Sequence, residues 1–245
     1  MTLHIGILAC SAEGAALCYR TICTRAPALM GAHAHPEVSL HGLSLADYVD
    51  RLQAGDLAGV ADLMLRSADR LAAAGADFLI CPDNTVHAAF DLVAPRSPLP
   101  WLHIAEVVAE AAQARGLARL GLMGTRWLAE GDVYPAILDA RGIAWRRPPA
   151  AQIAAIDRII MDELVNDRRE PASLAVLQAV IAGFRAAGCD AAVLGCTELP
   201  LVLHDDNAAL PVLDSTRLLA QRALQAAIDG ALPGAWTEAK KGETR

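Results

Sequence analysis

Short apolar runs alternate with longer segments of helical periodicity along most of the chain. The runs predicted to form strands are residues 3–9, 37–43, 76–81, 119–123, 191–194 and 210–213. Between them, apolar residues recur every three or four positions, as in the predicted helices 57–72, 154–164, 174–184 and 216–228. Asp56 and Ser173 are expected to cap two of these helices. Alternating strands and helices predict an α/β fold built on parallel sheets.

Two stretches of the chain repeat each other. Residues 73–85 and 186–198 both open with the pattern AAG-x-D, continue as an apolar run and lie 113 positions apart. A second pair, residues 5–11 and 120–126, repeats at an offset of 115. This order predicts a duplicated half-molecule: two pseudo-symmetric, Rossmann-like lobes, each with a parallel sheet, and an active site in the cleft between them.

A cluster of prolines, Pro95, Pro98 and Pro100, marks the expected boundary between the lobes. The first lobe is predicted to comprise residues 1–102 and a returning segment, 212–235, which carries a C-terminal helix. Residues 103–211 are predicted to form the second lobe. The polar residues 236–245 are expected to be a flexible tail.

Charge and composition limit the possible partners. The formal net charge of the 245 residues is −7, which argues against nucleic acid and anionic membranes. No leader pattern and no run of eighteen apolar residues is found, so we expect a soluble, cytoplasmic protein. The six cysteines form no CxxC pair, and His33 and His35, expected on one face of a strand, lack a third ligand at a recognisable spacing. We therefore expect reduced thiols and no metal.

The repeat places two proton-exchanging groups at equivalent positions. In its register Asp83 stands opposite Cys196, and each follows a predicted strand. An acid and a base on opposite sides of a cleft suit the removal of a proton from one face of a carbon and its return to the other face. Cys196 and Asp83 are thus the predicted catalytic pair. A helix expected to begin just after Cys196 would favour its thiolate.

Hydroxyl, amide and carboxylate side chains accompany this pair in the predicted loops. Such groups, together with loop amides, can hold a small-molecule carboxylate and stabilise charge that develops on it. Glu198, close to Cys196, and His87, close to Asp83, can each orient a catalytic group or cap a helix. Of the two, Glu198 is the stronger functional candidate. The predicted substrate-binding residues are Ser11, Asn84, Thr85, Thr125, Thr197 and Glu198.

The segment Val193-Leu194-Gly195-Cys196-Thr197-Glu198-Leu199-Pro200 resembles the second active-cysteine signature of the cofactor-independent aspartate/glutamate racemase family. The resemblance extends to residues 5–8, 84–87, 102–105, 124–126 and 159–164. It implies two pseudo-symmetric α/β lobes, no pyridoxal phosphate or other cofactor, and a homodimer.

Two departures from the family pattern stand out. Asp83 occupies the place of the family's first catalytic cysteine, and Cys81, two residues earlier and followed by a proline, is interpreted as structural. Family members that act on aspartate tend to carry a lysine just before the segment matching residues 156–164, where this chain has Ala154 and Ala155.

Three hypotheses follow. The first is an amino-acid racemase or epimerase that uses Cys196 and Asp83 at the α-carbon. The second is a related cofactor-free decarboxylase or cis/trans isomerase in which Cys196 is the only protonating thiol. The third is a protein that binds a small acid and has lost catalysis.

Overall fold

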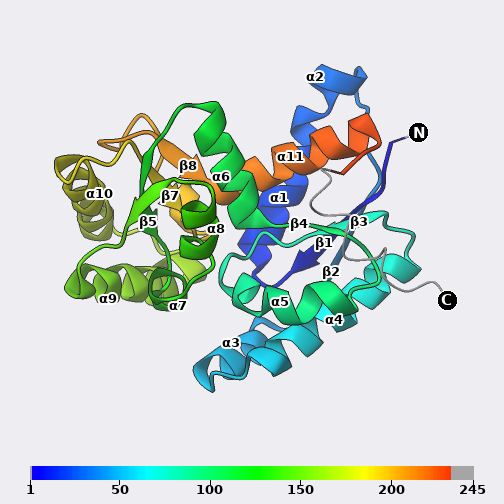
Figure 1. Ribbon diagram of the computed structural model, residues 1–245, viewed down its shortest axis with the longest axis horizontal. Helices are drawn as coiled ribbons and strands as arrows, with labels where there is room; N and C mark the ends of the chain where they lie inside the picture. Colours follow the sequence, from blue (N-terminus) through cyan, green and yellow to red (C-terminus); the bar gives the residue numbers. More distant parts are fainter. Residues whose placement is uncertain (1, 233–245) are drawn as a thin grey trace. The chain divides into compact units, whose positions relative to one another are not determined.

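The computed structural model describes residues 2–232 and divides into two compact units (Figure 1). The first unit comprises Met1–Ile104 and Leu219–Arg245, and the second comprises Ala105–Leu218. The predicted tail, residues 236–245, lies outside the described residues. Among residues 2–232, none of the helices combines the length and the apolar character that a bilayer-spanning segment needs.

The first unit contains a four-stranded parallel sheet in the order β2-β1-β3-β4. Its strands are β1 (Ile5–Ala9), β2 (Val38–Gly42), β3 (Phe78–Ile80) and β4 (Trp101–Leu102). The helices are α1 (Ala12–Arg25), α2 (Pro27–Met30), α3 (Leu45–Gln53), α4 (Leu57–Ala73) and α5 (Phe90–Val93). Helix α1 packs on β1, and α4 packs on β1, β2 and α3 (Figure 1). Every residue of β1 and β3 is buried, as expected for the central strands of a sheet covered on both faces.

The second unit repeats this design with the order β6-β5-β7-β8, again all parallel. Its strands are β5 (Arg119–Met123), β6 (Ala144–Arg146), β7 (Ala191–Leu194) and β8 (Val212–Asp214). The helices are α6 (Ile104–Ala114), α7 (Arg126–Glu130), α8 (Pro135–Ala140), α9 (Ala150–Arg158), α10 (Pro171–Ala186) and α11 (Ser215–Asp229). Helix α11 continues into the first unit. The predicted α/β class with two equivalent parallel sheets is confirmed.

The repeated AAG-x-D pattern ends one helix in each unit. Helices α4 and α10 stop just before the alanine–glycine step, where Gly75 has φ +90° and Gly188 has φ +76°. A glycine reaches this left-handed region without the penalty that a Cβ atom imposes, so it is the usual residue just beyond a helix end. The two copies therefore share the turn that leads from the helix into β3 or β7.

The aspartate of the same pattern ties each turn to the neighbouring strand. Asp77 Oδ2 accepts a hydrogen bond of 2.7 Å from the backbone N–H of His4, just before β1. Asp190 Oδ2 accepts one of 2.8 Å from the N–H of Arg119, the first residue of β5. The repeated aspartate thus has a structural role: in each sheet it links the turn before one strand to the start of the adjacent strand and so helps to fix their register.

Some local predictions are confirmed and others are wrong. Asp56 caps α4, because its side chain accepts from the N–H of Gly59 at 2.8 Å. Ser173 does not cap α10, which begins earlier with Pro171 at its first position. His33 and His35 lie before β2 in a turn where His33 has φ +65°, so they do not share the face of a strand. The two short strands β4 and β6 escaped prediction, because three residues or fewer carry little periodicity.

Candidate active site

In the first unit, the loop after β3 carries Asp83 to the carboxyl end of the sheet. Its carboxylate accepts hydrogen bonds from the backbone N–H of Cys10 at 3.1 Å and of Ser11 at 3.2 Å. Both donors lie where β1 passes into α1. Two backbone donors at a strand end stabilise a negative charge at this position, and they fix the carboxylate beside the exit of the neighbouring strand.

The other predicted residues of this unit surround Asp83. Ser11 is the N-cap of α1, and its Oγ accepts from the N–H of Gly14 at 3.2 Å. Asn84 is buried and Thr85 is half-buried, and together they begin the 3-10 turn that runs to Ala89. The structure therefore brings the four sequence-predicted residues of the first unit, Asp83, Ser11, Asn84 and Thr85, to one end of its sheet.

A buried histidine supports the Asp83 loop from behind. His87 Nδ1 donates a 3.0 Å hydrogen bond to the backbone carbonyl of Asp83. Burial lowers the pKa of His87 to about 4, so the ring is neutral at physiological pH. Its ring lies edge-on to that of His103, with centroids 4.6 Å apart, and burial also lowers the pKa of His103. His87 therefore holds the backbone of the Asp83 loop through this hydrogen bond.

Two thiols also lie beside Asp83. The sulfur atoms of Cys10 and Cys81 and a carboxylate oxygen of Asp83 are all within 4.8 Å of one another. Burial, followed by the nearness of Cys81 and Asp83, raises the pKa of the Cys10 thiol. Cys10 had no assigned role in the sequence. Its position two residues before a helix, at the end of a buried strand, was the signal that could have placed it here.

In the second unit, Cys196 follows β7 and contacts a buried acid. Cys196 Sγ donates a hydrogen bond to Glu198 Oε2 at 2.9 Å, and Thr197 Oγ1 donates to the same oxygen at 2.7 Å. Cys196 is 8% exposed and Glu198 is 4% exposed. A carboxylate at this distance can take the thiol proton and so generate the thiolate.

The helix expected just after Cys196 is absent. Only a three-residue 3-10 turn, Leu199–Leu201, follows the Cys196–Glu198 loop. The helix dipole predicted to favour the thiolate is therefore wrong, and the partner that the structure provides for Cys196 is the carboxylate of Glu198.

The Cys196 loop packs tightly against the loop after β5. Gly195 donates a 2.7 Å hydrogen bond to the carbonyl of Met123, and a Cβ atom on Gly124 would lie 3.1 Å from the carbonyl oxygen of Gly195. Thr125, which follows Gly124, is the N-cap of α7. Residues Thr125, Thr197, Glu198 and Cys196 are therefore all carried by the carboxyl ends of β5 and β7.

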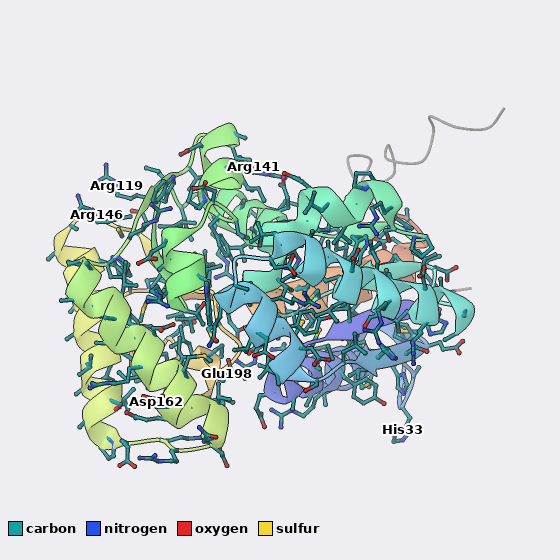
Figure 2. The ribbon with its side chains drawn as sticks, turned by 90° about the horizontal axis from the view of Figure 1, so that it is seen from below. His33, Arg119, Arg141, Arg146, Asp162 and Glu198 are labelled. Atoms are coloured by element: carbon teal, nitrogen blue, oxygen red, sulfur yellow. The ribbon has the colours of Figure 1, made fainter. Side chains whose placement is uncertain are left out.

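Basic residues of the second unit lie at both ends of β5. Arg119 is the first residue of β5, at the opposite end of the strand from Thr125, and Arg146 is paired with the same strand. Figure 2 shows Arg119 and Arg146 near each other and away from Glu198. Arg126, in contrast, directly follows Thr125 as the exposed first residue of α7. Within this unit, the groups that these strand ends offer a ligand are therefore hydroxyls, backbone amides, a thiol, a carboxylate and a guanidinium group.

Comparison with known proteins gives a consistent family. The model of the Asp/Glu/Hydantoin racemase family matches residues 7–223. The glutamate racemase of Pseudomonas aeruginosa is 28% identical over 190 residues, which cover 71% of this chain and 69% of that protein. An Asp/Glu racemase candidate from Yersinia pestis has a solved structure with a TM-score of 0.84 and 28% identity, covering 92% of this chain and 99% of its own.

A more distant structure shares the fold. An aspartate racemase homologue from Pyrococcus horikoshii has a TM-score of 0.79 at 23% identity, over 92% of this chain and 99% of its own. This chain thus shares its α/β fold with both solved structures.

Proposed function

The chain belongs to the Asp/Glu/Hydantoin racemase family, and on that premise we propose that it is a cofactor-independent racemase or epimerase of an amino acid. Cys196 and Asp83 are the proposed acid/base groups at the α-carbon. The observation that carries the proposal is the 2.9 Å hydrogen bond from Cys196 Sγ to Glu198 Oε2, because it supplies the thiol with a base.

The proposed reaction moves one proton off the substrate and puts one back. Glu198 takes the proton of Cys196, and the thiolate then removes the α-proton, which leaves the electron pair delocalised into the substrate carboxylate. Protonated Asp83 delivers a proton to the other face of the same carbon, so that one C–H bond breaks and one forms. In the reverse direction the Asp83 carboxylate is the base and the Cys196 thiol is the acid.

The neighbouring polar groups are proposed to hold the substrate carboxylate. Ser11 and Thr125 are N-caps that accept backbone hydrogen bonds through oxygen, and a hydroxyl group also carries one donor hydrogen. Asn84 and Thr85, after β3, and Thr197, after β7, add further donors. Donors directed at a carboxylate stabilise the charge that accumulates there as the α-proton leaves.

Independence from pyridoxal phosphate is supported by the lysine content. The chain has only two lysines, Lys240 and Lys241, which stand side by side in the C-terminal segment. Pyridoxal-phosphate enzymes bind their cofactor as a Schiff base with a lysine amine. No residue from 1 to 239 provides such an amine, so the thiol and the carboxylates are the groups proposed to do the chemistry.

The experiment is deuterium wash-in at the α-carbon, measured by mass spectrometry with chiral separation. The amino acids tested first are aspartate and glutamate, the substrates that the relatives' names print, followed by neutral amino acids. We expect deuterium incorporation in the wild type and its loss in the Cys196→Ala variant. The Cys23→Ala variant, which changes a half-buried cysteine on α1, should retain deuterium incorporation. Absence of exchange with every amino acid would contradict the proposal.

A second candidate function is favoured by the environment of Asp83. The two backbone N–H groups that donate to its carboxylate stabilise the charged form, which neither delivers a proton nor is a strong base. In that case Cys196 alone would protonate a carbanion, as in a decarboxylase, or add to a double bond, as in a cis/trans isomerase. Release of carbon dioxide from a substituted malonate, or isomerisation of an unsaturated diacid, would identify this alternative. Full ligand affinity without any turnover would identify a binding protein.

A further inference from the structure

Two cysteines and an aspartate that are distant in the sequence meet at one point in the first unit. Cys10 follows β1, and Cys81 and Asp83 follow β3. Their two sulfur atoms and one carboxylate oxygen are within 4.8 Å of one another, and we call these three residues the thiol–carboxylate cluster. The two thiols are fully or almost fully buried, whereas Asp83 is half-buried.

The backbone holds the cluster in place. Strands β1 and β3 are adjacent and parallel, with Ile7 paired to Ile80, so both chains leave the sheet at the same end. The N–H of Cys10 donates to the Asp83 carboxylate, and the thiol of Cys81 lies 3.8 Å from the carbonyl oxygen of Asp83. The cluster is therefore part of a packed sheet edge and needs no rearrangement of the fold to form.

A buried tyrosine lies at the same place. Tyr48 of α3 is fully buried beside Cys10, Cys81 and Ser67, and Cys10 and Ser67 are the hydrogen-bonding neighbours of its hydroxyl group. A hydroxyl oxygen has two lone pairs, so this group can also serve as an oxygen ligand next to the two thiols.

We propose that the thiol–carboxylate cluster binds one zinc ion through Cys10 Sγ, Cys81 Sγ and the Asp83 carboxylate. Thiolate and carboxylate are ordinary zinc ligands, and in a tetrahedral site neighbouring ligand atoms are about 3.4–3.8 Å apart. Separations within 4.8 Å reach this range by small side-chain movements. On zinc binding, the thiols of Cys10 and Cys81 would release their two protons to solvent, and water or the Tyr48 hydroxyl group would supply a fourth ligand. The three residues form no CxxC motif because they follow two different strands, β1 and β3.

A disulfide between Cys10 and Cys81 fits the sheet less well. Extending the register past Ile7 and Ile80 places Leu8 opposite Cys81, so Cys10 lies two residues further along its strand. Such a diagonal pair has Cα atoms about 8 Å apart, from a strand spacing of about 4.8 Å and a rise of about 3.3 Å per residue. A disulfide requires Cα atoms about 4.4–6.8 Å apart, whereas two cysteines that bind the same ion can have Cα atoms further apart.

The proposed ion would also control Asp83. Zinc bound to its carboxylate would prevent that group from exchanging protons, so the metal would inhibit racemisation reversibly; this consequence rests on the proposed function. Binding of the ion does not rest on it. The experiment therefore measures binding directly, and failure of the proposed catalysis would leave the metal result unaffected.

The test uses the full-length, untagged protein, reduced and stripped with a chelator. Zinc is titrated in competition with a chromophoric chelator, and cadmium is added separately to record the thiolate-to-cadmium charge-transfer absorption in the ultraviolet. We expect one zinc per chain in the wild type, with affinity at least tenfold weaker in Cys10→Ala and in Cys81→Ala. Cys23→Ala, on α1 outside the cluster, is the matched control and should bind as the wild type does.

A fourth variant protects the test against misfolding of the cysteine variants. Asp83→Asn changes a half-buried residue and keeps both thiols, so it should weaken zinc binding while the cadmium–thiolate absorption remains. Zinc affinity that is equal in the wild type, Cys10→Ala and Cys81→Ala would overturn the proposal. Loss of two titratable thiols on mild oxidation, with no zinc retained by the reduced protein, would likewise overturn it in favour of a disulfide.

Discussion

Cys196 Sγ donates a 2.9 Å hydrogen bond to Glu198 Oε2, and both side chains are buried in the loop after β7. The two residues are separated by Thr197 alone, whose hydroxyl donates to the same carboxylate oxygen. The Glu198 carboxylate thus accepts two hydrogen bonds, which orient it next to the thiol proton of Cys196. In this loop, Cys196, Thr197 and Glu198 therefore act together: the thiol is held beside a base, and the hydroxyl group holds that base in place.

Replacing Glu198 by Gln should slow α-proton exchange by about 10²-fold or more, because a positioned general base typically contributes 10²–10⁴-fold. The amide keeps the size of the side chain but cannot accept the thiol proton. Deuterium wash-in under saturating substrate measures the effect, and circular dichroism checks the fold. Glu170→Gln, at an exposed helix N-cap, is the control; wild-type exchange in Glu198→Gln would contradict the assigned role.

Acid should destabilise the protein between pH 6.5 and about 4 because of His87. Its pKa is lowered to about 4 by burial, whereas in the unfolded chain it titrates near 6.5. Over that window the unfolded state binds a proton that the folded state does not, so the free energy of unfolding falls as the pH falls, by up to about 3 kcal/mol. Below pH 4 both states are protonated and this contribution no longer changes.

Urea unfolding at pH 7, 5.5 and 4.5 tests this dependence. His87→Gln should flatten the pH dependence, leaving the part due to His103, whose pKa is lowered in the same direction. His204→Gln changes an exposed histidine and should leave the profile as in the wild type. Identical profiles for the wild type and His87→Gln would show that His87 is accessible to protons in the folded protein.

Gly195→Ala should destabilise the second unit by about 1–3 kcal/mol, as overpacked substitutions do. The added Cβ would collide with the side chain of Leu128 and lie 3.0 Å from the carbonyl oxygen of Met123. Because Gly195 precedes Cys196, the displacement should also reduce catalysis. Thermal or urea unfolding gives the free energy.

A glycine in open space supplies the comparison for this prediction. Gly183 lies within α10, where an added Cβ meets no atom within 4 Å. Gly183→Ala should therefore stabilise the protein by up to about 1 kcal/mol, since alanine is the better helix former. Equal effects of the two alanine substitutions would refute the packing argument.

Asp77→Ala and Asp190→Ala should each cost about 0.5–1.5 kcal/mol of stability, the net contribution of an ordinary hydrogen bond. Each substitution removes the acceptor of a backbone N–H at the start of β1 or β5, and the hydrogen bond of Asp77 is the less exposed of the two. Asp69→Ala, on the exposed face of α4, should change stability by less than about 0.5 kcal/mol. If the two former variants unfold at the same urea concentration as the wild type, the strand-tying role of the repeat is wrong.

The periodic pattern of the chain was sufficient to predict the fold class and the two equivalent sheets. Apolar runs, helix-ending glycines and the repeated aspartate are local signals, and each acts within a few residues of its own position. The same signals placed Asp83 and Cys196 at equivalent strand ends. Very short strands, such as β4 and β6, could not be predicted from periodicity. They are strands because they pair with a neighbouring strand, and their own two or three residues carry too little pattern.

The partners of the candidate site residues were decided by the tertiary structure alone. A helix start expected just after Cys196 predicted a helix dipole as its partner, but only the three-residue turn Leu199–Leu201 follows, and the carboxylate of Glu198 takes that place. The meeting of Cys10 with Cys81 and Asp83 depends on the pairing of β1 with β3, and such pairing joins residues that no local pattern relates. The sequence by itself therefore determined which groups reach the ends of the strands, and only the fold decided which of them touch.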